Sequence, residues 1–296
     1  MPEDERVAMQ GGQDPRARGG ATPARALDAL GLRAQRRLSQ SFLTNPAIAA
    51  AIAESAELTL NDTVLEIGPG LGVLTQHLVR MARRVVAVEL DAGLAAALSA
   101  QLGDPPNLEI VRADGLTVDL AALVSPPFAV VANLPYHVAN PILFRLLFHE
   151  PRPTRIVAML QEEVAQRITG LNGRTTFLGA AIATAADARI VRRVAPGSFH
   201  PVPKVHSAVV RLDLHAEPVV PWPEVPGFIE FLRAGFTQPR KQLRNSLAAG
   251  LGVPPIEVAA IIAFAEVDPS HRGEQLALPV WVRLYRAWQA HAGIAA

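Results

Sequence analysis

The stretch VLEIGPGLGVLT, residues 64–75, decides the fold because it reads as a strand, a glycine-rich turn and the start of a helix. Open parallel sheets bind adenosine-containing cofactors at such a turn, just beyond the carboxyl end of the strand. A dinucleotide fingerprint would read G-x-G-x-x-G/A, but counting from Gly68 the third small position falls on Val73. S-adenosylmethionine is therefore a better candidate than NAD, with Gly68 and Gly70 as cofactor-binding residues. The alternative, that the glycines only permit a tight connection, stays open at this point.

Acidic residues accompany this turn on successive strands. Glu89 closes VVAVELD at about the distance from the turn where an acid accepts hydrogen bonds from both ribose hydroxyls. Asp114 ends IVRADGL and is placed to accept a hydrogen bond from the amino group of the cofactor adenine. We add Glu66, on the strand before the turn, to the cofactor-binding set. Each acid alone fits a solvated strand end equally well, but the carboxyl ends of parallel strands meet at one ligand-binding edge.

A quartet of polar and aromatic residues, Asn133-Leu134-Pro135-Tyr136, follows the fourth predicted strand. It suits methyl transfer to an amino nitrogen conjugated with an aromatic ring, which is planar and a poor nucleophile. The Asn133 side-chain oxygen and the Leu134 carbonyl would accept both amino hydrogens, so that positioning replaces a strong base. Pro135 stiffens the loop, and Tyr136 offers a flat face for stacking. We predict these four residues to be catalytic; the alternative is a strand-to-helix turn with a buried tyrosine.

The pattern outside these motifs predicts an α/β fold. Short β-branched runs recur at 63–67, 85–90, 108–112, 128–132, 155–160, 188–194 and 207–214, with helical segments between the first five. Asn140 and Pro141 are expected to cap and begin one of these helices. The runs predict a seven-stranded, mostly parallel sheet, in which the last two form an antiparallel edge hairpin joined by a Pro-rich loop, 195–204.

Three regions follow from this pattern. Residues 1–35, rich in Pro, Gly, Arg and Ala, are expected to be a disordered extension. Residues 36–216 form the predicted methyltransferase domain. After the Pro-punctuated linker 217–227 only helical patterns remain, at 228–235, 241–249, 255–264 and 279–292, so residues 217–296 comprise a linker and a small all-α domain.

Composition narrows the chemistry. The 296 residues include no cysteine, which removes disulfides, thiolate metal sites and cysteine nucleophiles and fits a cytoplasmic protein. We predict no metal site, and apolar runs are too short for a membrane span. The net charge is only +1, so a nucleic acid would have to meet local basic patches. His206 lies on the predicted edge hairpin, where a surface or packing role is favoured over that of a catalytic base.

Together the motifs resemble those of the ribosomal RNA adenine N6-dimethyltransferases, most closely the bacterial small-subunit enzymes. The resemblance covers nearly all of residues 36–290. The motifs occur in the family's order: RLSQSFL (37–43), LEIGPGLGVLT, VELD, ADGL, NLPY, LQEEVAQRI, FHPVPKVHSAVVRL (199–212) and FTQPRKQLRNSL (236–247).

The resemblance implies a Rossmann-like class I methyltransferase fold and a reaction. S-adenosylmethionine would be converted to S-adenosylhomocysteine, and two adjacent adenines near the 3′ end of 16S ribosomal RNA would become N6,N6-dimethyladenosine during late small-subunit assembly. The implied partner is the small ribosomal subunit, met by a monomer. The implied cofactor positions are Ser41, Leu43, Gly68, Glu89, Asp114 and Asn133, and Asn133 and Tyr136 would also face the target adenine.

Several positions depart from the family pattern. Ser39 and Ser41 replace the usual Gly and Asn, so the family's side-chain contact at Ser41 is in question, whereas a backbone contact could survive the change. His137 and His206 replace the usual Asn or Tyr and the usual Asp. Basic residues that could grip RNA fall in two groups, on a predicted helical turn and just before RLSQSFL: Arg240, Lys241 and Arg244, and Arg33, Arg36 and Arg37.

Three other functions share parts of this pattern. A large-subunit adenine methyltransferase of the macrolide-resistance type has NLPY-like motifs, but the F-x-P-x-P-K-V-x-S-A-V and R-K-x-x-R-N-S-L segments argue against it. A DNA adenine methyltransferase would need a sequence-reading domain that we do not find. A noncatalytic binding factor on the same fold is disfavoured by the intact glycine turn, Glu89, Asp114 and NLPY.

Overall fold

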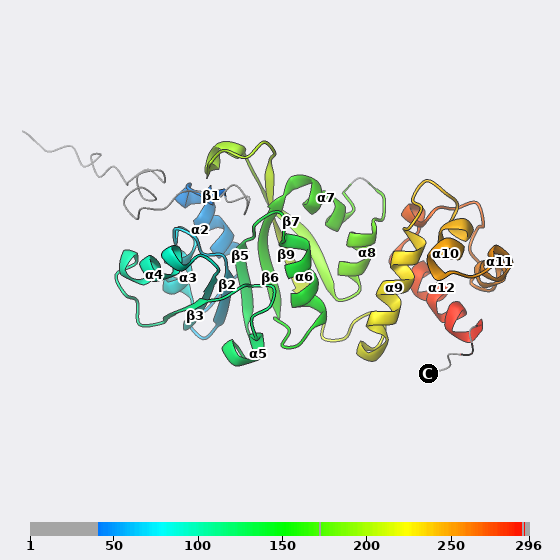
Figure 1. Cartoon of the computed structure of the whole chain (residues 1–296), viewed down its shortest axis with the longest axis horizontal. Coiled ribbons are helices and arrows are strands. Elements are labelled where there is room, and N and C mark those ends of the chain that lie inside the picture. Colours follow the sequence, from blue (N-terminus) through cyan, green and yellow to red (C-terminus); the bar gives the residue numbers. More distant parts are fainter. Residues whose placement is uncertain (1–40, 172, 292, 294–296) are drawn as a thin grey trace, which may run out of the picture.

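The computed structural model describes residues 41–171, 173–291 and 293. Predictions for the extension, Ser39, Arg33, Arg36 and Arg37 lie outside this part of the chain. Figure 1 shows two bodies side by side, a sheet flanked by helices and a group of helices at the C-terminal end. The bodies meet where Ala180 and Ala181 of α8 (Phe177–Ala183) pack into the core of the second one.

The sheet has seven strands in the order β4-β3-β2-β5-β6-β9-β7. The first five in this order, which all run parallel, are β4 (Leu108–Arg112), β3 (Arg84–Glu89), β2 (Thr63–Ile67), β5 (Ala129–Asn133) and β6 (Arg155–Gln161). The chain builds outward from β2 to β4 and then restarts at β5 on the other side of β2. This reversal is the topological switch point where such sheets bind ligands, and it lies between the glycine turn and the NLPY quartet.

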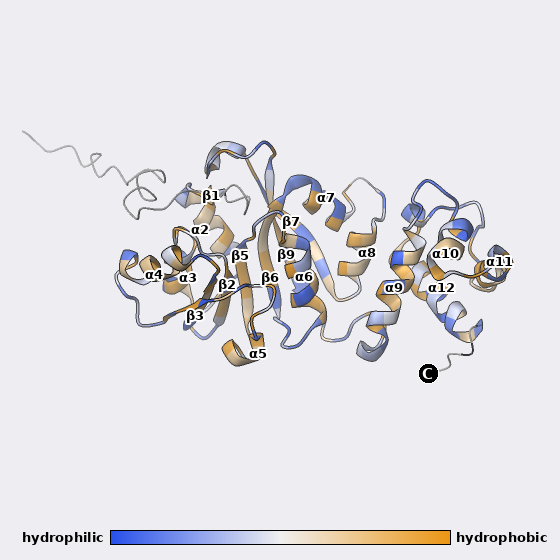
Figure 2. Ribbon diagram, viewed as in Figure 1, coloured by the Kyte–Doolittle hydropathy of each residue, from blue (hydrophilic) through white to orange (hydrophobic). Residues whose placement is uncertain are grey.

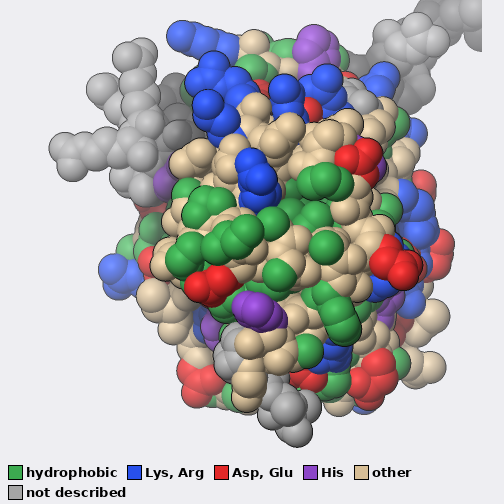
Figure 3. Space-filling view, turned by 90° about the vertical axis from the view of Figure 1, so that its right-hand side faces the viewer, with side chains coloured by type: hydrophobic (Ala, Val, Ile, Leu, Met, Phe, Trp, Pro, Cys, Tyr) green, Lys and Arg blue, Asp and Glu red, His purple; other side chains and the backbone are tan. Residues whose placement is uncertain are grey.

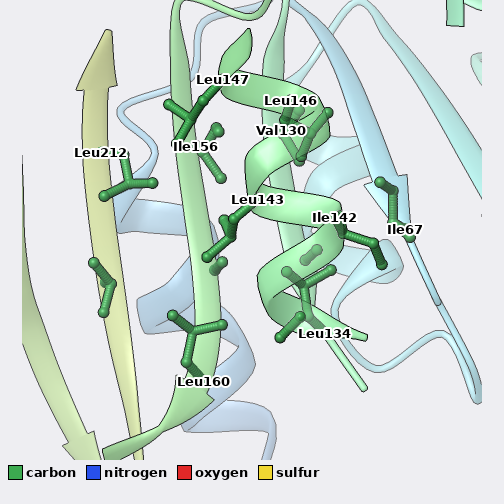
Figure 4. Packing of buried hydrophobic residues seen from close by; sticks show 14 of the residues in the cluster. Ile67, Val130, Leu134, Ile142, Leu143, Leu146, Leu147, Ile156, Leu160 and Leu212 are labelled. Atoms are coloured by element: carbon green, nitrogen blue, oxygen red, sulfur yellow. The ribbon is translucent and has the colours of Figure 1, made fainter. Parts of the chain in front are cut away.

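Helices cover both faces of the sheet, and most of its strands are therefore buried along nearly their whole length. On one face lie α5 (Leu120–Leu123), α6 (Ala139–Phe148), α7 (Glu162–Thr169) and α8; α2 (Pro46–Ser55) and α3 (Thr75–Met81) cover the other. Figure 4 shows Leu143, Leu146 and Leu147 of α6 directed at Val130 and Ile156 of the sheet. Figure 2 shows hydrophobic residues concentrated on the central strands.

Several helices begin where a side chain accepts hydrogen bonds from free backbone amides. The Asn45 side-chain oxygen accepts from the Ala47 amide at 3.0 Å, and Pro46 opens α2. The Asp91 carboxylate accepts from the Gly93 amide at 2.8 Å and starts α4 (Ala92–Gln101), which packs beside β3 and β4. None of the helices in the described ranges is both long and apolar enough to cross a membrane.

The predicted antiparallel hairpin at the edge of the sheet is confirmed. Its second strand in the sequence is the inner one, and its first strand forms the edge. Strand β9 (Ser207–Leu214) runs antiparallel between β6 and the edge strand β7 (Ala186–Val194). The predicted loop 195–204 is not free of regular structure. It contains a 3-10 turn at Pro196–Ser198 and the short strand β8 (Phe199–His200), which pairs antiparallel with β1 (Phe42–Leu43).

The C-terminal helices form the predicted all-α body with its own core. They are α9 (Val225–Gly235), α10 (Leu243–Leu251), α11 (Pro255–Phe264) and α12 (Leu278–His291). Trp281 is fully buried among them. Helix α9 starts inside the predicted linker, after a 3-10 turn at Trp222–Glu224. The predicted start of α10 at Lys241 was wrong: Arg240 and Lys241 lie in the preceding turn, and the helix begins at Leu243.

The predicted cap at Asn140 was also wrong. Helix α6 begins at Ala139, so Asn140 lies inside its first turn, with its side-chain oxygen buried and without a partner among the described residues. The reason is the turn before it. The Val138 amide donates to the Pro135 carbonyl at 3.1 Å, and the Val138 carbonyl then accepts from the Ile142 amide at 3.0 Å. Val138 therefore occupies the cap position.

Candidate functional site

The glycine turn between β2 and α3 is held by the acid at the end of β3. Gly68, Gly70 and Gly72 have φ angles of 72°, 57° and 74°, a region that residues with a Cβ adopt at a cost. The Gly70 amide donates to Glu89 Oε2 at 3.0 Å, and the Asp91 amide donates to Glu89 Oε1 at 2.9 Å. These two bonds fix the carboxylate and the turn relative to each other.

The Glu89 carboxylate still has acceptor sites for a ligand. It is only 5% exposed, and burial raises its pKa while the amides of Asp91 and Gly70 oppose that shift. A carboxylate can accept about four hydrogen bonds, and two come from the backbone. The remaining lone pairs suit a pair of hydroxyl groups, because a buried acceptor without donors is costly.

Asp114 follows β4 at the same edge of the sheet as Glu89. Its side chain is exposed, and Oδ1 accepts from the Leu116 amide at 2.8 Å. The Ala113 amide donates to the Glu89 carbonyl at 3.0 Å, which places the two acid-bearing segments side by side. Both acids line one hollow together with Gly68, Leu90, Leu116 and Ile142.

Glu66 is a buried carboxyl group with one oxygen that lacks a hydrogen-bond partner among the described residues. It is 1% exposed, and that oxygen is Oε2. Burial raises its pKa to about 8, with a smaller contribution from the charge of Glu89 and an opposing one from Thr75. Glu66 nevertheless lines the cleft beside the glycine turn. A cationic group entering the cleft would favour the ionised form of this carboxyl.

The NLPY quartet forms the opposite wall of the same cleft. A Cβ built on Gly68 would lie 3.8 Å from Pro135 Cδ and 3.9 Å from the Asn133 carbonyl oxygen, so the glycine turn and the quartet touch. Leu134 is 1% exposed and packs into the core, which directs its side chain away from the cleft. Asn133, Pro135 and Tyr136 are partly exposed, and all four residues line the cleft.

Tyr136 is held by a hydrogen bond to strand β9, which lies beyond β6 in the sheet. Its hydroxyl lies 2.6 Å from Ser207 Oγ, at the start of β9, and Ser207 is fully buried. Burial raises the pKa of Tyr136, and the bond to Ser207 opposes that shift. Strand pairing brings Ser207 opposite Gln161 of β6. No local sequence signal indicates this hydrogen bond, because the two residues are far apart in the chain and meet only after β9 inserts beside β6.

The segment around Ser41 and Leu43 forms a further wall of the cleft. Ser41, Phe42 and Leu43 all line it, and a Cβ on Gly70 would lie 3.1 Å from the Phe42 ring. Strand β1 is fixed by its pairing with β8, and the Thr44 amide donates to the Ser198 carbonyl at 2.9 Å. The hollow around Asp114 shares Gly68, Glu89 and Pro135 with this cleft, so the two form one elongated site.

A model of the family described as "Ribosomal RNA adenine dimethylase" matches residues 31–263. The chain belongs to this family. Among ribosomal RNA adenine dimethylases, it is similar to two bacterial proteins named "Ribosomal RNA small subunit methyltransferase A". The one from Syntrophotalea carbinolica is 38% identical over 88% of this chain and 98% of its own. The one from Dehalococcoides mccartyi strain ATCC BAA-2266 is 36% identical over 86% of this chain and 88% of its own.

Solved structures of a 23S rRNA methyltransferase and a dimethyladenosine transferase share the fold. The crystal structure of the 23S rRNA methyltransferase ErmE is 33% identical and matches 83% of this chain and 98% of that chain, with a TM-score of 0.67. A dimethyladenosine transferase from Plasmodium falciparum matches 85% of this chain and 98% of its own, with a TM-score of 0.71 and 24% identity. The Rossmann-like methyltransferase fold predicted from the sequence is thereby confirmed.

The cleft of this adenine dimethylase fits S-adenosylmethionine. Glu89 is a buried acceptor beside the glycine turn, as a ribose diol requires, and Glu66 has one buried oxygen without a partner among the described residues, as an ammonium group requires. Gly68 and Gly70 carry no side chain, so their backbone is open to a ligand between Pro69 and Leu71, which also line the cleft. Asp114 lies farther along the cleft, where its free oxygen can meet an adenine amino group.

The remaining predicted residues lie away from this cleft. Arg240, Lys241 and Arg244 are exposed in and just before α10, on the C-terminal body. His206 is exposed, and its backbone carbonyl accepts from the Glu162 amide at 3.0 Å. This position agrees with a surface histidine and gives no support to a catalytic base. His137 is exposed and lines the hollow around Asp114.

Proposed function

We propose that this protein transfers methyl groups from S-adenosylmethionine to the N6 atoms of two adjacent adenines near the 3′ end of small-subunit ribosomal RNA, giving N6,N6-dimethyladenosine. The observation that carries the proposal is the contact between the glycine turn, Glu89 and the NLPY quartet in one cleft. The same site binds the cofactor on one wall and offers acceptors for an amino group on the other. The cofactor supplies an electrophilic methyl group.

The quartet suits an amine because it presents acceptors and no strong base. An Asn133 side-chain oxygen and the Leu134 carbonyl can accept the two amino hydrogens and hold the nitrogen towards the methyl donor. Pro135 has no amide hydrogen to compete for these acceptors. Tyr136, with its hydroxyl bound to Ser207, offers a fixed ring on which the base can stack. Once one amino hydrogen is replaced by methyl, one acceptor still holds the other hydrogen.

The target must leave its stack to reach this cleft. Flipping a base costs a few kcal/mol and costs least in a loop, which favours loop adenines as substrates. Binding by the protein has to offset that cost. Arg240, Lys241 and Arg244 are exposed cations that can contact the phosphates of a folded particle. We propose the small subunit during late assembly as that particle, met by a monomer in the cytoplasm.

A second candidate is methylation of large-subunit RNA. The similarity to ErmE, at 33% identity, is the observation that favours it. The small-subunit relatives reach 38% identity and match nearly their whole length. Our preference rests on two sequences: FHPVPKVHSAVV, which runs from β8 into β9, and RKQLRNSL, which runs from the preceding turn into α10.

The test is mass spectrometry of ribosomal RNA fragments after purified protein is incubated with under-methylated small subunits and labelled cofactor. We expect dimethyladenosine at two neighbouring positions, with monomethyl species as intermediates. The Asn133→Ala variant should stay folded and bind the subunit but lose most turnover. Near-normal turnover would show that the quartet is structural. In a parallel incubation with large-subunit RNA, products on that RNA and none on the small subunits would favour the second candidate.

A further inference from the structure

Arg145 connects the helix that follows the quartet to the loop that carries Asp114. From α6 its Nη1 donates to the Gly115 carbonyl at 2.8 Å, and its Nη2 donates to the Val118 carbonyl. These are the only two hydrogen bonds of its side chain that join described residues. One guanidinium group thus holds both ends of the segment Gly115 to Val118.

The charge of Arg145 is balanced by backbone dipoles. The side chain is partly buried, and none of the ion pairs formed by the described residues includes it. The amides of Thr117 and Val118 both donate to the Asp114 carbonyl, so the loop forms a short turn with its free carbonyls towards α6. A cation is favourable at that end of a turn.

The same two elements both line the adenine end of the cleft. The loop contributes Asp114 and Leu116, and α6 contributes Ile142, which is one helical turn before Arg145. On its other side the loop already touches the sheet, since a Cβ on Gly115 would lie 2.6 Å from Ile67 Cγ2. The loop therefore cannot move towards β2, and Arg145 limits its movement away from α6.

We infer that Arg145 is a positioning residue that sets the width of the adenine end of the cofactor cleft. It does not touch the cofactor. It keeps Asp114 and Leu116 at a fixed separation from Ile142, so that the adenine ring enters a preformed slot and the loop need not be ordered on binding. This inference rests on the proposed use of the cleft for S-adenosylmethionine.

The test measures dissociation constants by calorimetry for two probes, S-adenosylhomocysteine and 5′-methylthioadenosine, which lacks the amino-acid end. Arg145→Met should weaken both by the same factor, about tenfold, and Arg145→Lys should weaken both less. The KM for S-adenosylmethionine should rise while kcat at saturating cofactor stays unchanged. Hydrogen exchange at the Thr117 and Val118 amides should be faster in the free variant and return towards the wild-type rate when the probe binds.

Arg155→Met is the matched control. Arg155 also donates to two backbone carbonyls, those of Ala56 at 2.6 Å and Glu57 at 3.3 Å, but at the opposite edge of the sheet. The Arg155→Met variant should have the same dissociation constants for both probes as the wild type. Unchanged affinity in Arg145→Met, a loss seen with S-adenosylhomocysteine alone, or an equal loss in Arg155→Met would overturn the inference. If Arg145→Met does not fold, the same measurements on Arg145→Lys decide. Failure of the wild type to bind either probe would instead refute the cofactor assignment itself.

Discussion

At the scale of single residues, the site depends on carboxyl groups buried where a ligand can reach them. Glu89 uses two of its acceptor positions on the backbone of the cleft and leaves the others for a ribose. Glu66 leaves one oxygen without a partner among the described residues. Both groups make the empty cleft less favourable than the filled one, because a buried acceptor without a donor costs free energy.

Glu89→Ala should raise the dissociation constant for S-adenosylmethionine at least tenfold, about 1.4 kcal/mol. The variant loses the acceptor for the ribose hydroxyls and also the bond that orients the Gly70 amide. Calorimetry on the folded variant checks the value. Glu109→Ala is a suitable control, because Glu109 pairs with Arg84 on the surface of the same region at 2.5 Å. Equal affinity of Glu89→Ala and wild type would refute the role.

Glu66 makes cofactor binding depend on pH. Its folded pKa of about 8 lies above the ordinary value of 4.5, so in the empty protein the group is protonated at neutral pH. Its contribution to stability is fully present below pH 4.5 and is lost as the pH rises through about 8. An ammonium group beside Glu66 favours the ionised form. Binding should therefore release a proton, and affinity should rise with pH up to about 8.

Calorimetry at pH 7 in buffers of different ionisation enthalpy measures that proton release. Glu66→Gln should abolish the Glu66-dependent part, whereas Glu109→Gln should retain it. The difference between the variants isolates Glu66 from the titration of the cofactor itself. Identical proton release in wild type and Glu66→Gln would show that Glu66 does not change its protonation state.

At the scale of elements, close helix contacts fix the C-terminal body. Gly250 of α10 lies against α9, where a Cβ would be 2.4 Å from Ala234 Cα and 2.7 Å from the Ala234 carbonyl oxygen. Both neighbours are backbone atoms and cannot rotate away. Helix α10 therefore needs glycine in its last turn in spite of the weaker helix propensity.

Gly250→Ala should lower the free energy of unfolding by about 1 to 3 kcal/mol, because overpacking outweighs the gain of up to about 1 kcal/mol in helix propensity. Chemical denaturation followed by circular dichroism measures the change. Ala249→Ser, at an exposed neighbouring position, should stay within about 0.5 kcal/mol of wild type. A more stable Gly250→Ala variant would mean that α9 and α10 separate easily.

The sequence alone predicted the strands, the switch point and the residues at the strand ends, because each depends on a local pattern. Glu89, Asp114 and the quartet lie at the carboxyl edge of the sheet as expected. Contacts between distant segments were not predictable. The bond of Ser207 to Tyr136, the Phe42 ring against Gly70 and the bridge from Arg145 all require the finished tertiary structure. The Asn140 cap failed because a turn at Pro135 starts the helix earlier.

At the scale of the whole molecule, basic residues are few and their location matters. Residues 217–296 contain seven basic and seven acidic side chains. Figure 3 shows Lys and Arg side chains gathered along one border of the C-terminal face, with hydrophobic side chains across its middle. Ile256 and Phe264 of α11 are 77% and 76% exposed. A polyanion can therefore be held only along part of the surface, which favours a target of fixed shape.

Assembled, under-methylated small subunits should be methylated faster than protein-free RNA at the same salt concentration. Replacing Arg240, Lys241 and Arg244 by Gln should weaken subunit binding and reduce the slope of log K against log salt by about 0.7 for each phosphate that the variant no longer neutralises. Filter binding across a salt series measures both. Arg80, in α3, and Arg83, just before β3, are also exposed. Replacing these two residues by Gln should change neither subunit binding nor the salt slope. Equal rates on both substrates would contradict the need for a shaped target.

The position of β9 has a consequence for how the protein is made. A growing chain emerges from its amino end, so β7 is synthesised before β9, although β9 is its only neighbour in the sheet of described strands. The edge strand must wait until residues 207–214 arrive and insert between it and β6. The same event delivers Ser207 to Tyr136. A nascent chain therefore fixes Tyr136 in the step that completes the sheet, and a chain released before Ser207 lacks both the inner strand β9 and this hydrogen bond.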